Sequence, residues 1–181
     1  MFRTLFCCVL AVLSWPAGVQ SQSPYAGQEF REIKTLSPQE ISDYLSGKGM
    51  GLAKAAELNG YPGPAHVLEL ATQLHLTADQ KAKTENLFKR MQARAISLGK
   101  ELVEEERALN NIFASHSVTP EALGVLLTRI AKLQGQVRQV HLEAHLEQTA
   151  LLTPEQVGNY NRLRGYATSA SNDSHEQRRA T

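Results

Sequence analysis

Two histidines four residues apart are the clearest chemical signal in the sequence. His141 and His145 project from one face of a helix, as two imidazoles on one metal ion require. Glu143 lies between them, about 200° round the helix from His141, and points away from such an ion. Imidazole ligands favour zinc, nickel or copper over calcium. The pair predicts either a divalent transition-metal site or two histidines that are solvated or packed at a helix edge.

A complete metal site needs more than this pair. His66, His75 and His116, or a glutamate such as Glu105, are candidates for a further ligand, and a second copy of the chain is another source. Two imidazoles alone do not complete the ligand set of such an ion. We therefore expect that no cofactor is required, and that any metal bound is a divalent ion such as zinc, nickel or copper.

Enzymatic chemistry has little support. The sequence contains no GxSxG or HExxH motif, and its only cysteines are Cys7 and Cys8. The acidic run 104–106 is typical of a solvated helix face with local ion pairs. A glycine-rich nucleotide-binding loop is also missing. We predict that the protein is not an enzyme and uses no ATP.

The composition limits the fold and the partners. The chain has 181 residues, of which 42% are hydrophobic and 6% aromatic, and its net charge is +1. This length suits one compact domain, and the scarcity of aromatic and β-branched residues disfavours a β-sandwich. A nearly neutral chain lacks the basic surface of a nucleic-acid-binding protein.

The first residues have the pattern of a secretory signal peptide. Arg3 precedes an apolar run at 5–13, which Pro16 ends, and small residues follow up to Ser21. Cleavage after Ser21, or alternatively after Ala17, would remove both cysteines. No other run is long and apolar enough to span a bilayer. We expect residues 1–21 to be the signal peptide and the mature chain to fold outside the cytoplasm without disulfides.

Residues 22–63 form an N-terminal extension with short helices. Ser37, Pro38 and Glu40 predict a capping box and a helix over about 38–45. Glycines then loosen the chain before a second short helix over about 52–58. The breaker at 59–64 separates it from helical spacing over 65–74.

Two long helices follow. Apolar residues at alternating spacings of three and four predict helices over about 78–114 and 120–150, and the short connection between them makes them antiparallel neighbours. A last helix begins after Thr153, and residues 167–181 have the composition of a disordered tail. The predicted fold is all-α: a long antiparallel helical hairpin with shorter flanking helices. The expected core positions are Phe88, Met91, Ala95, Leu98, Leu102, Leu109 and Ile112 in the first helix, and Leu123, Leu126, Ile130, Leu133, Val137, Val140 and Ala144 in the second.

One short motif occurs twice, at the start of a long helix and at the start of the last one. Both copies read LTxxQ, and they consist of Leu76, Thr77 and Gln80, and of Leu152, Thr153 and Gln156. Each copy predicts a helix cap. Two copies about 76 residues apart, behind a signal peptide and around a long helix pair, resemble the Spy/CpxP family of periplasmic LTxxQ proteins. The resemblance covers 64–166, the predicted helical domain.

The resemblance implies a small all-helical periplasmic protein, typically a homodimer shaped like a shallow cradle. Members include ATP-independent chaperones, envelope-stress regulators and metal-responsive proteins of the CnrX/ZraP kind. We expect a chaperone that protects unfolded or misfolded envelope proteins. The alternative is a metal sensor or resistance protein using His141 and His145, although the metal-responsive relatives carry such pairs earlier in the domain. A third option is a structural dimer that docks on a membrane sensor protein.

A chaperone needs accessible apolar surface beside charge. Further apolar residues lie outside the core rows of both long helices, and basic residues accompany those of the first helix. Alternatively, these residues pack against the short helices or a dimer partner. The candidate client-binding residues are Leu87, Ile96, Leu127, Leu142 and Leu146, with Lys83, Arg90 and Arg94.

Overall fold

The structure is a computed structural model that describes residues 23–166, and in this part of the chain all regular elements are α-helices. The chain divides into two compact units, Met1–Phe30 and Arg31–Thr181. In the first unit, residues 23–30 form turns, such as the one closed by the N–H of Ala26 donating to the carbonyl of Ser23 (3.0 Å). The predicted signal peptide and tail lie outside the described residues. The predicted all-α fold is confirmed.

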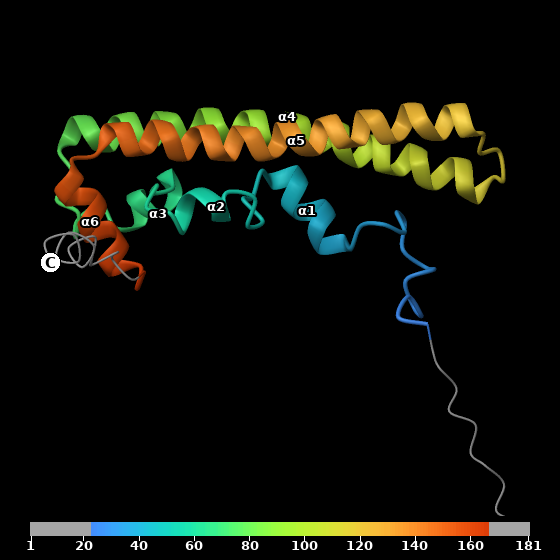
Figure 1. Cartoon of the computed structure of the whole chain (residues 1–181), viewed down its shortest axis with the longest axis horizontal. Helices are drawn as coiled ribbons and strands as arrows, with labels where there is room; N and C mark the ends of the chain where they lie inside the picture. Colours follow the sequence, from blue (N-terminus) through green and yellow to red (C-terminus); the bar gives the residue numbers. More distant parts are fainter. Residues whose placement is uncertain (1–22, 167–181) are drawn as a thin grey trace, which may run out of the picture. The chain divides into compact units, whose positions relative to one another are not determined.

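The described part of the second unit, residues 31–166, contains six helices (Figure 1): α1 (Pro38–Ser46), α2 (Lys54–Glu57), α3 (Pro64–Glu69), α4 (Ala78–Ala114), α5 (Pro120–Leu151) and α6 (Pro154–Leu163). Ser37, Thr77 and Thr153 form capping boxes that start α1, α4 and α6. Thr119 caps α5 by accepting from the N–H of Ala122 (3.2 Å). Because these caps satisfy backbone groups that the first helical turn leaves unpaired, they fix where each helix begins.

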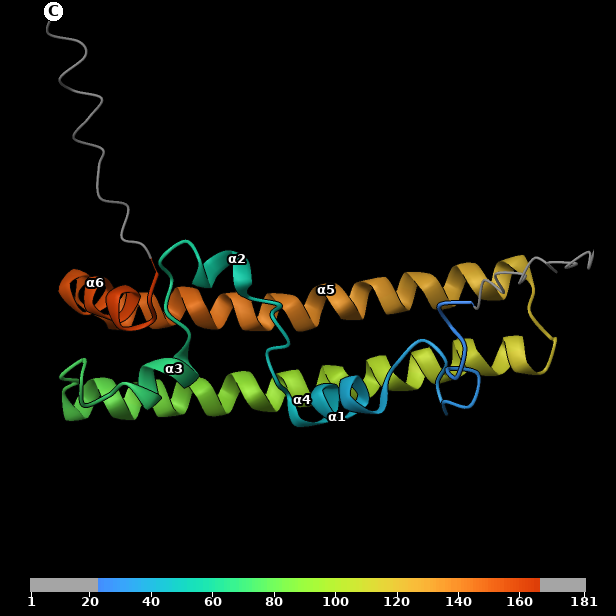
Figure 2. The same ribbon diagram turned by 90° about the horizontal axis from the view of Figure 1, so that it is seen from below.

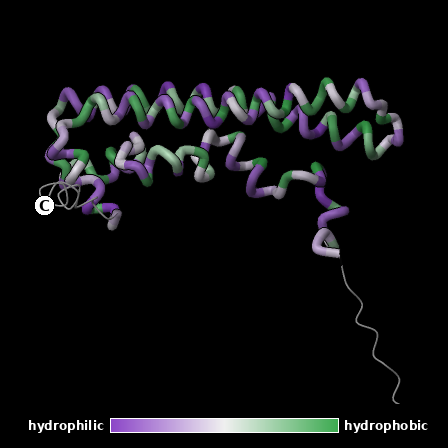
Figure 3. Tube along the Cα trace, in the orientation of Figure 1, coloured by the Kyte–Doolittle hydropathy of each residue, from purple (hydrophilic) through white to green (hydrophobic). Residues whose placement is uncertain are grey.

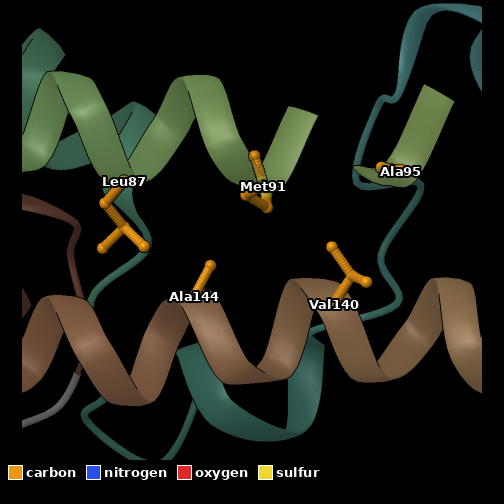
Figure 4. Packing of buried hydrophobic residues seen from close by; sticks show 5 residues of the cluster. All are labelled: Leu87, Met91, Ala95, Val140 and Ala144. Atoms are coloured by element: carbon orange, nitrogen blue, oxygen red, sulfur yellow. The ribbon is translucent and has the colours of Figure 1, made fainter. Parts of the chain in front are cut away.

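The two long helices α4 and α5 form the predicted antiparallel hairpin. Figure 4 shows part of their interface, where Leu87 and Met91 of α4 face Val140 and Ala144 of α5. A second apolar cluster further along the hairpin contains Leu102, Ile130 and Leu133. Burial of these rows is the main reason why the long helices stay paired.

The short helices cover one side of the hairpin (Figures 1 and 2). α1 lies along α4, α2 lies against α5, and α3 contacts both long helices. α6 turns back at the end of α5, where Val67, Leu74, Leu152 and Tyr160 form a third cluster. Within the described residues, none of the helices has the length and apolar character that crossing a membrane would need.

Two of the short helices are shorter than the sequence predicts. α3 ends at Glu69 rather than near residue 74, because Leu70 leaves helical geometry and the chain turns to bring Leu74 into the third cluster. α2 comprises only Lys54–Glu57, because Gly51 has a φ of 75° and the residues after it form turns. In both places a local turn replaces a predicted helical end.

The connecting-loop end of the hairpin is less well covered. We call residues 107–129 the loop end; none of them is buried, and the predicted core positions Leu109, Ile112, Leu123 and Leu126 are only half-buried. Apolar residues nevertheless recur along both helices up to the loop, as Figure 3 shows. The loop end therefore keeps the sequence pattern of a packed interface while lacking a full set of neighbours.

Candidate functional site

The two LTxxQ motifs meet at the opposite end of the hairpin. We call this the motif end, residues 64–87 and 144–166. Gln80 Nε2 donates to Gln156 Oε1 (2.8 Å), and Gln156 Nε2 donates to Gln80 Oε1 (3.1 Å). Each amide group also donates to a backbone carbonyl, Gln80 to Leu151 (3.0 Å) and Gln156 to Leu74 (3.2 Å). The glutamines thus join segments that lie far apart in sequence.

The same glutamines also complete the caps of their own helices. Gln80 Oε1 accepts from the N–H of Thr77 (3.1 Å), and Gln156 Oε1 accepts from the N–H of Thr153 (2.9 Å). A glutamate could make these cap bonds, but its carboxylate has no hydrogen to donate across the pair. The sequence predicts the caps but not the pairing, for which the repeated motif is the only signal.

The motif leucines pack beside this pair. Leu152 is buried in the third cluster with Val67, Leu74 and Tyr160, and Leu76 packs against that cluster at its edge. Each leucine therefore anchors the start of its helix to a shared apolar core while the glutamine anchors it by hydrogen bonds. The motif residues together close the motif end, which is a structural role.

The two histidines of α5 occupy different environments. His145 Nδ1 donates to the carbonyl of Tyr61 (2.7 Å) and lies 3.7 Å from Glu57 Oε2. His141 is only 4% exposed, and its Nε2 has no hydrogen-bond partner among the described residues. Burial lowers the pKa of His141 below its usual value, and the charge of His145 lowers it further. Burial therefore favours the neutral form of His141.

Glu57, which the sequence did not single out, is the centre of a partly buried polar cluster. Its Oε1 accepts from the hydroxyls of Tyr160 (2.6 Å) and Tyr166 (2.9 Å) and lies 3.4 Å from Arg164 Nε. Burial, the hydrogen bond to Glu57 and its negative charge raise the pKa of Tyr160 well above its usual value. α2 is thus tied to α6 through one carboxylate, a contact that no local pattern reveals.

The described residues do not fit a metal centre. His141 and His145 share a face of α5, but no group of three or more His, Cys, Asp or Glu side chains is gathered there or elsewhere in residues 23–166. His66 instead pairs with Glu69 on its own helix (2.8 Å). A zinc, nickel or copper ion needs more ligands than the histidine pair supplies.

The five apolar client-binding candidates divide into three groups. Leu87 is 3% exposed and packs in the hairpin interface, so its assignment to an open surface was wrong: it faces α5 and not solvent. Ile96 and Leu142 are half-buried, and Ile96 lies against Gly47 at the end of α1. Leu127 (48% exposed) and Leu146 (57% exposed) are open to solvent.

The basic candidates are paired rather than free. Arg90 binds Glu147 (2.9 Å), and Arg94 binds Glu143 (3.2 Å), so both cross from α4 to acidic residues of α5. Lys83 pairs with Asp79 of its own helix (2.7 Å). The two pairs between α4 and α5 line a groove together with the apolar residues Leu87, Met91, Val140 and Ala144. The groove therefore carries charge of both signs, and a basic face is not present there.

In its described residues the chain is thus an all-helical hairpin protein, in which paired LTxxQ motifs join the start of α4 to the start of α6. The family model described as LTXXQ motif family protein matches residues 65–164, more than half of the chain. The protein belongs to this family, that of the Spy/CpxP-like proteins. No curated protein and no solved structure matches the chain.

Proposed function

We propose that the protein is an ATP-independent chaperone of the Spy/CpxP type, which a signal peptide delivers to the periplasm and which holds unfolded envelope proteins there. The observation that supports this most is the loop end. Phe113 (52% exposed), Val125 (52% exposed), Val118 and Leu127 present apolar side chains to solvent on a scaffold closed firmly at its other end. Exposed apolar side chains on a stable scaffold suit weak binding to many unfolded chains.

The charges of the hairpin fit the same function. The chain is nearly neutral overall, and its long helices carry ion pairs close to apolar side chains. Exposed ion pairs are weak, so these side chains can re-pair with charges on a client at little cost. Apolar contacts would then hold the bound client, while charges of both signs would increase the rate at which the client and the hairpin meet.

An aggregation assay tests the proposal. Reduced lysozyme is a suitable client, because residues 23–166 contain no cysteine and the reductant leaves them unchanged. We expect residues 22–181 to suppress light scattering at about equimolar ratio without nucleotide. The triple variant Phe113→Gln, Val125→Gln, Leu127→Gln should need about fivefold more protein, since it replaces apolar contacts with polar side chains.

A matched control separates the loop end from apolar exposure in general. Leu163→Gln changes one exposed apolar residue of α6, away from the loop end, and should leave the suppression unchanged. No suppression by the unaltered protein at several-fold excess would refute the chaperone function. Equal loss in the triple variant and in the control would refute the assignment of the client surface to the loop end.

We also propose that the chain forms a homodimer through the half-buried loop-end row of Leu109, Ile112, Leu123 and Leu126. A second copy would complete the burial that a single chain leaves unfinished. Sedimentation at several concentrations tests this, and a monomer at all of them would refute it. A metal-sensing function has less support, since the histidine pair lacks further ligands.

A further inference from the structure

Part of the chain that precedes the family match lies along α4. We call residues 31–51 the strap; they contain α1 and precede residue 65, where the family match begins. Ile33 and Leu36 of the strap are buried against Val103 of α4, with Ile41 and Tyr44 packed beside them. The strap therefore covers an apolar part of α4 with apolar side chains of its own.

Polar contacts fix the direction of the strap. At its start, Thr35 Oγ1 donates to Glu106 Oε2 (2.8 Å), and the N–H of Lys34 donates to Asn110 Oδ1 (3.3 Å). At its other end, Gln92 Nε2 donates to the carbonyl of Ser46 (3.4 Å). The strap thus runs antiparallel to α4, from near residue 110 back to near residue 92, as Figure 2 shows.

α4 has a glycine where the strap comes closest. A Cβ at Gly99 would overlap the backbone carbonyl of Tyr44, so only glycine allows α1 to lie this near. Glycine inside a helix costs about 1 kcal/mol relative to alanine. Gly124 of α5 also lies inside a long helix, but a Cβ there would meet nothing within 4 Å. The close approach at Gly99 is therefore a specific feature of the strap contact.

The strap is held less firmly than the hairpin. α1 has nine residues, none of them buried, and a helix of this length is not stable by itself. Its polar contacts to α4 are mostly exposed and contribute little. The part of the strap after α1 has positive φ at Gly47 (68°), Met50 (46°) and Gly51 (75°). The strap can therefore open locally while α4 and α5 remain folded.

We infer that the strap is a displaceable cover, which competes with an unfolded client for the apolar surface of α4. The surface beneath it contains Ile96, Gly99 and Val103. The strap itself shows which chemistry fits there, namely a short segment carrying aliphatic side chains and one aromatic ring. The matching partner is a segment of an unfolded polypeptide with the same apolar spacing. This inference rests on the chaperone function proposed above. It adds a client surface on α4, beneath the strap, to the one proposed at the loop end.

The variant Gly99→Ala tests the inference, because the added methyl group displaces Tyr44 while favouring the helical state of α4. Gly124→Ala is the matched control. We expect trypsin to cleave after Arg31, Lys34 and Lys48 about tenfold faster in Gly99→Ala than in the control, with unchanged helical circular dichroism. The concentration that half-suppresses aggregation of reduced lysozyme should fall about fivefold, because apparent affinity scales with the fraction of open molecules.

A second variant keeps the test decisive if α1 accommodates the methyl group. Ile33→Asp with Leu36→Asp removes both buried anchors, since a carboxylate cannot be buried against Val103 without a partner. Faster cleavage of the strap without better suppression in either variant would overturn the inference and leave the chaperone function intact. If the unaltered protein and all variants fail to suppress aggregation, the proposed function itself is refuted.

Discussion

The two ends of the hairpin use the same helices in opposite ways. The motif end pairs polar groups: the amides of Gln80 and Gln156 bind each other, and the hydroxyls of Tyr160 and Tyr166 donate to Glu57 of α2. The loop end has no buried residue, and apolar side chains such as Phe113 and Val125 remain exposed. One end is thus held by specific polar contacts, while the other retains apolar surface.

This difference separates what stabilises the fold from what is free to bind. The hydrogen bonds of the Gln80 and Gln156 amides to each other and to two backbone carbonyls permit few alternative arrangements, so they fix how the chain after α3, α4, α5 and α6 meet. Apolar surface at the loop end requires no fixed geometry of a partner and suits varied contacts. A rigid end and an adaptable end on one pair of helices support the proposed chaperone function.

The largest expected effect is a contrast in core packing. Leu102 is 1% exposed in the cluster with Ile130 and Leu133, whereas Leu126 at the loop end is half-buried. Leu102→Ala should lower the free energy of unfolding by about 3 kcal/mol. Leu126→Ala should lower it by only about 1 kcal/mol, because the folded state buries less of the Leu126 side chain. Equilibrium urea unfolding followed by circular dichroism measures both values.

Equal losses in these two variants would show that the loop end is as well packed as the middle of the hairpin. Measuring both variants at several protein concentrations gives a second comparison. If a dimer covers Leu126, its substitution becomes more costly at concentrations where the dimer forms, while the effect of Leu102→Ala changes less.

The glutamine pair gives the next largest effect. Gln80→Ala removes the cap bond to Thr77 and leaves the Leu151 carbonyl and the Gln156 side chain without their partner. We expect a loss of about 2 kcal/mol in the free energy of unfolding. Gln80→Glu keeps the cap but removes both donors, and should lose about 1 kcal/mol.

The control is Gln134→Ala, an exposed glutamine of α5, which should change the free energy of unfolding by less than about 0.5 kcal/mol. If Gln80→Glu unfolds at the same urea concentration as the unaltered protein, then the cap alone accounts for the motif, and the reciprocal pair contributes nothing.

The parts of the fold that could be predicted from sequence are those set by local signals. Thr77 and Thr153 begin helices because a side-chain oxygen satisfies nearby N–H groups, and the apolar spacing marks which helix face is buried. The spacing does not say what covers that face. Leu87 and Ile96 were therefore assigned to open surface, although α5 covers the first and Gly47 contacts the second.

The contacts of Glu57 and His145 could not be predicted from sequence, because they join segments that lie far apart along the chain. Glu57 lies in a helix of four residues whose own sequence gives no sign that its carboxylate reaches Tyr160, more than one hundred residues later. The spacing of the two histidines is visible in the sequence. The hydrogen bond of His145 to the backbone carbonyl of Tyr61 could not be predicted, because every residue has such a carbonyl. Such contacts follow from how the helices pack, not from local propensity.

The smallest expected effect is a pH dependence confined to one region. His141 is buried on α5, and burial lowers its pKa in the folded state. An unfolded histidine titrates near pH 6.5, so on acidification the unfolded chain takes up a proton before the folded chain does. The free energy of unfolding should therefore fall as the pH is lowered from about 7.0 to about 5.5, and hydrogen exchange should quicken along α5 near His141 more than at the loop end.

His141→Leu removes this titrating group and should flatten that part of the pH dependence. His116→Asn is the matched control, since His116 is exposed in the connecting loop with a φ of 54°, a conformation that asparagine also adopts. If His141→Leu keeps the full pH dependence, or if exchange quickens first at the loop end, then acid acts on exposed groups rather than on His141. The response to pH would then not distinguish the middle of α5 from the loop end.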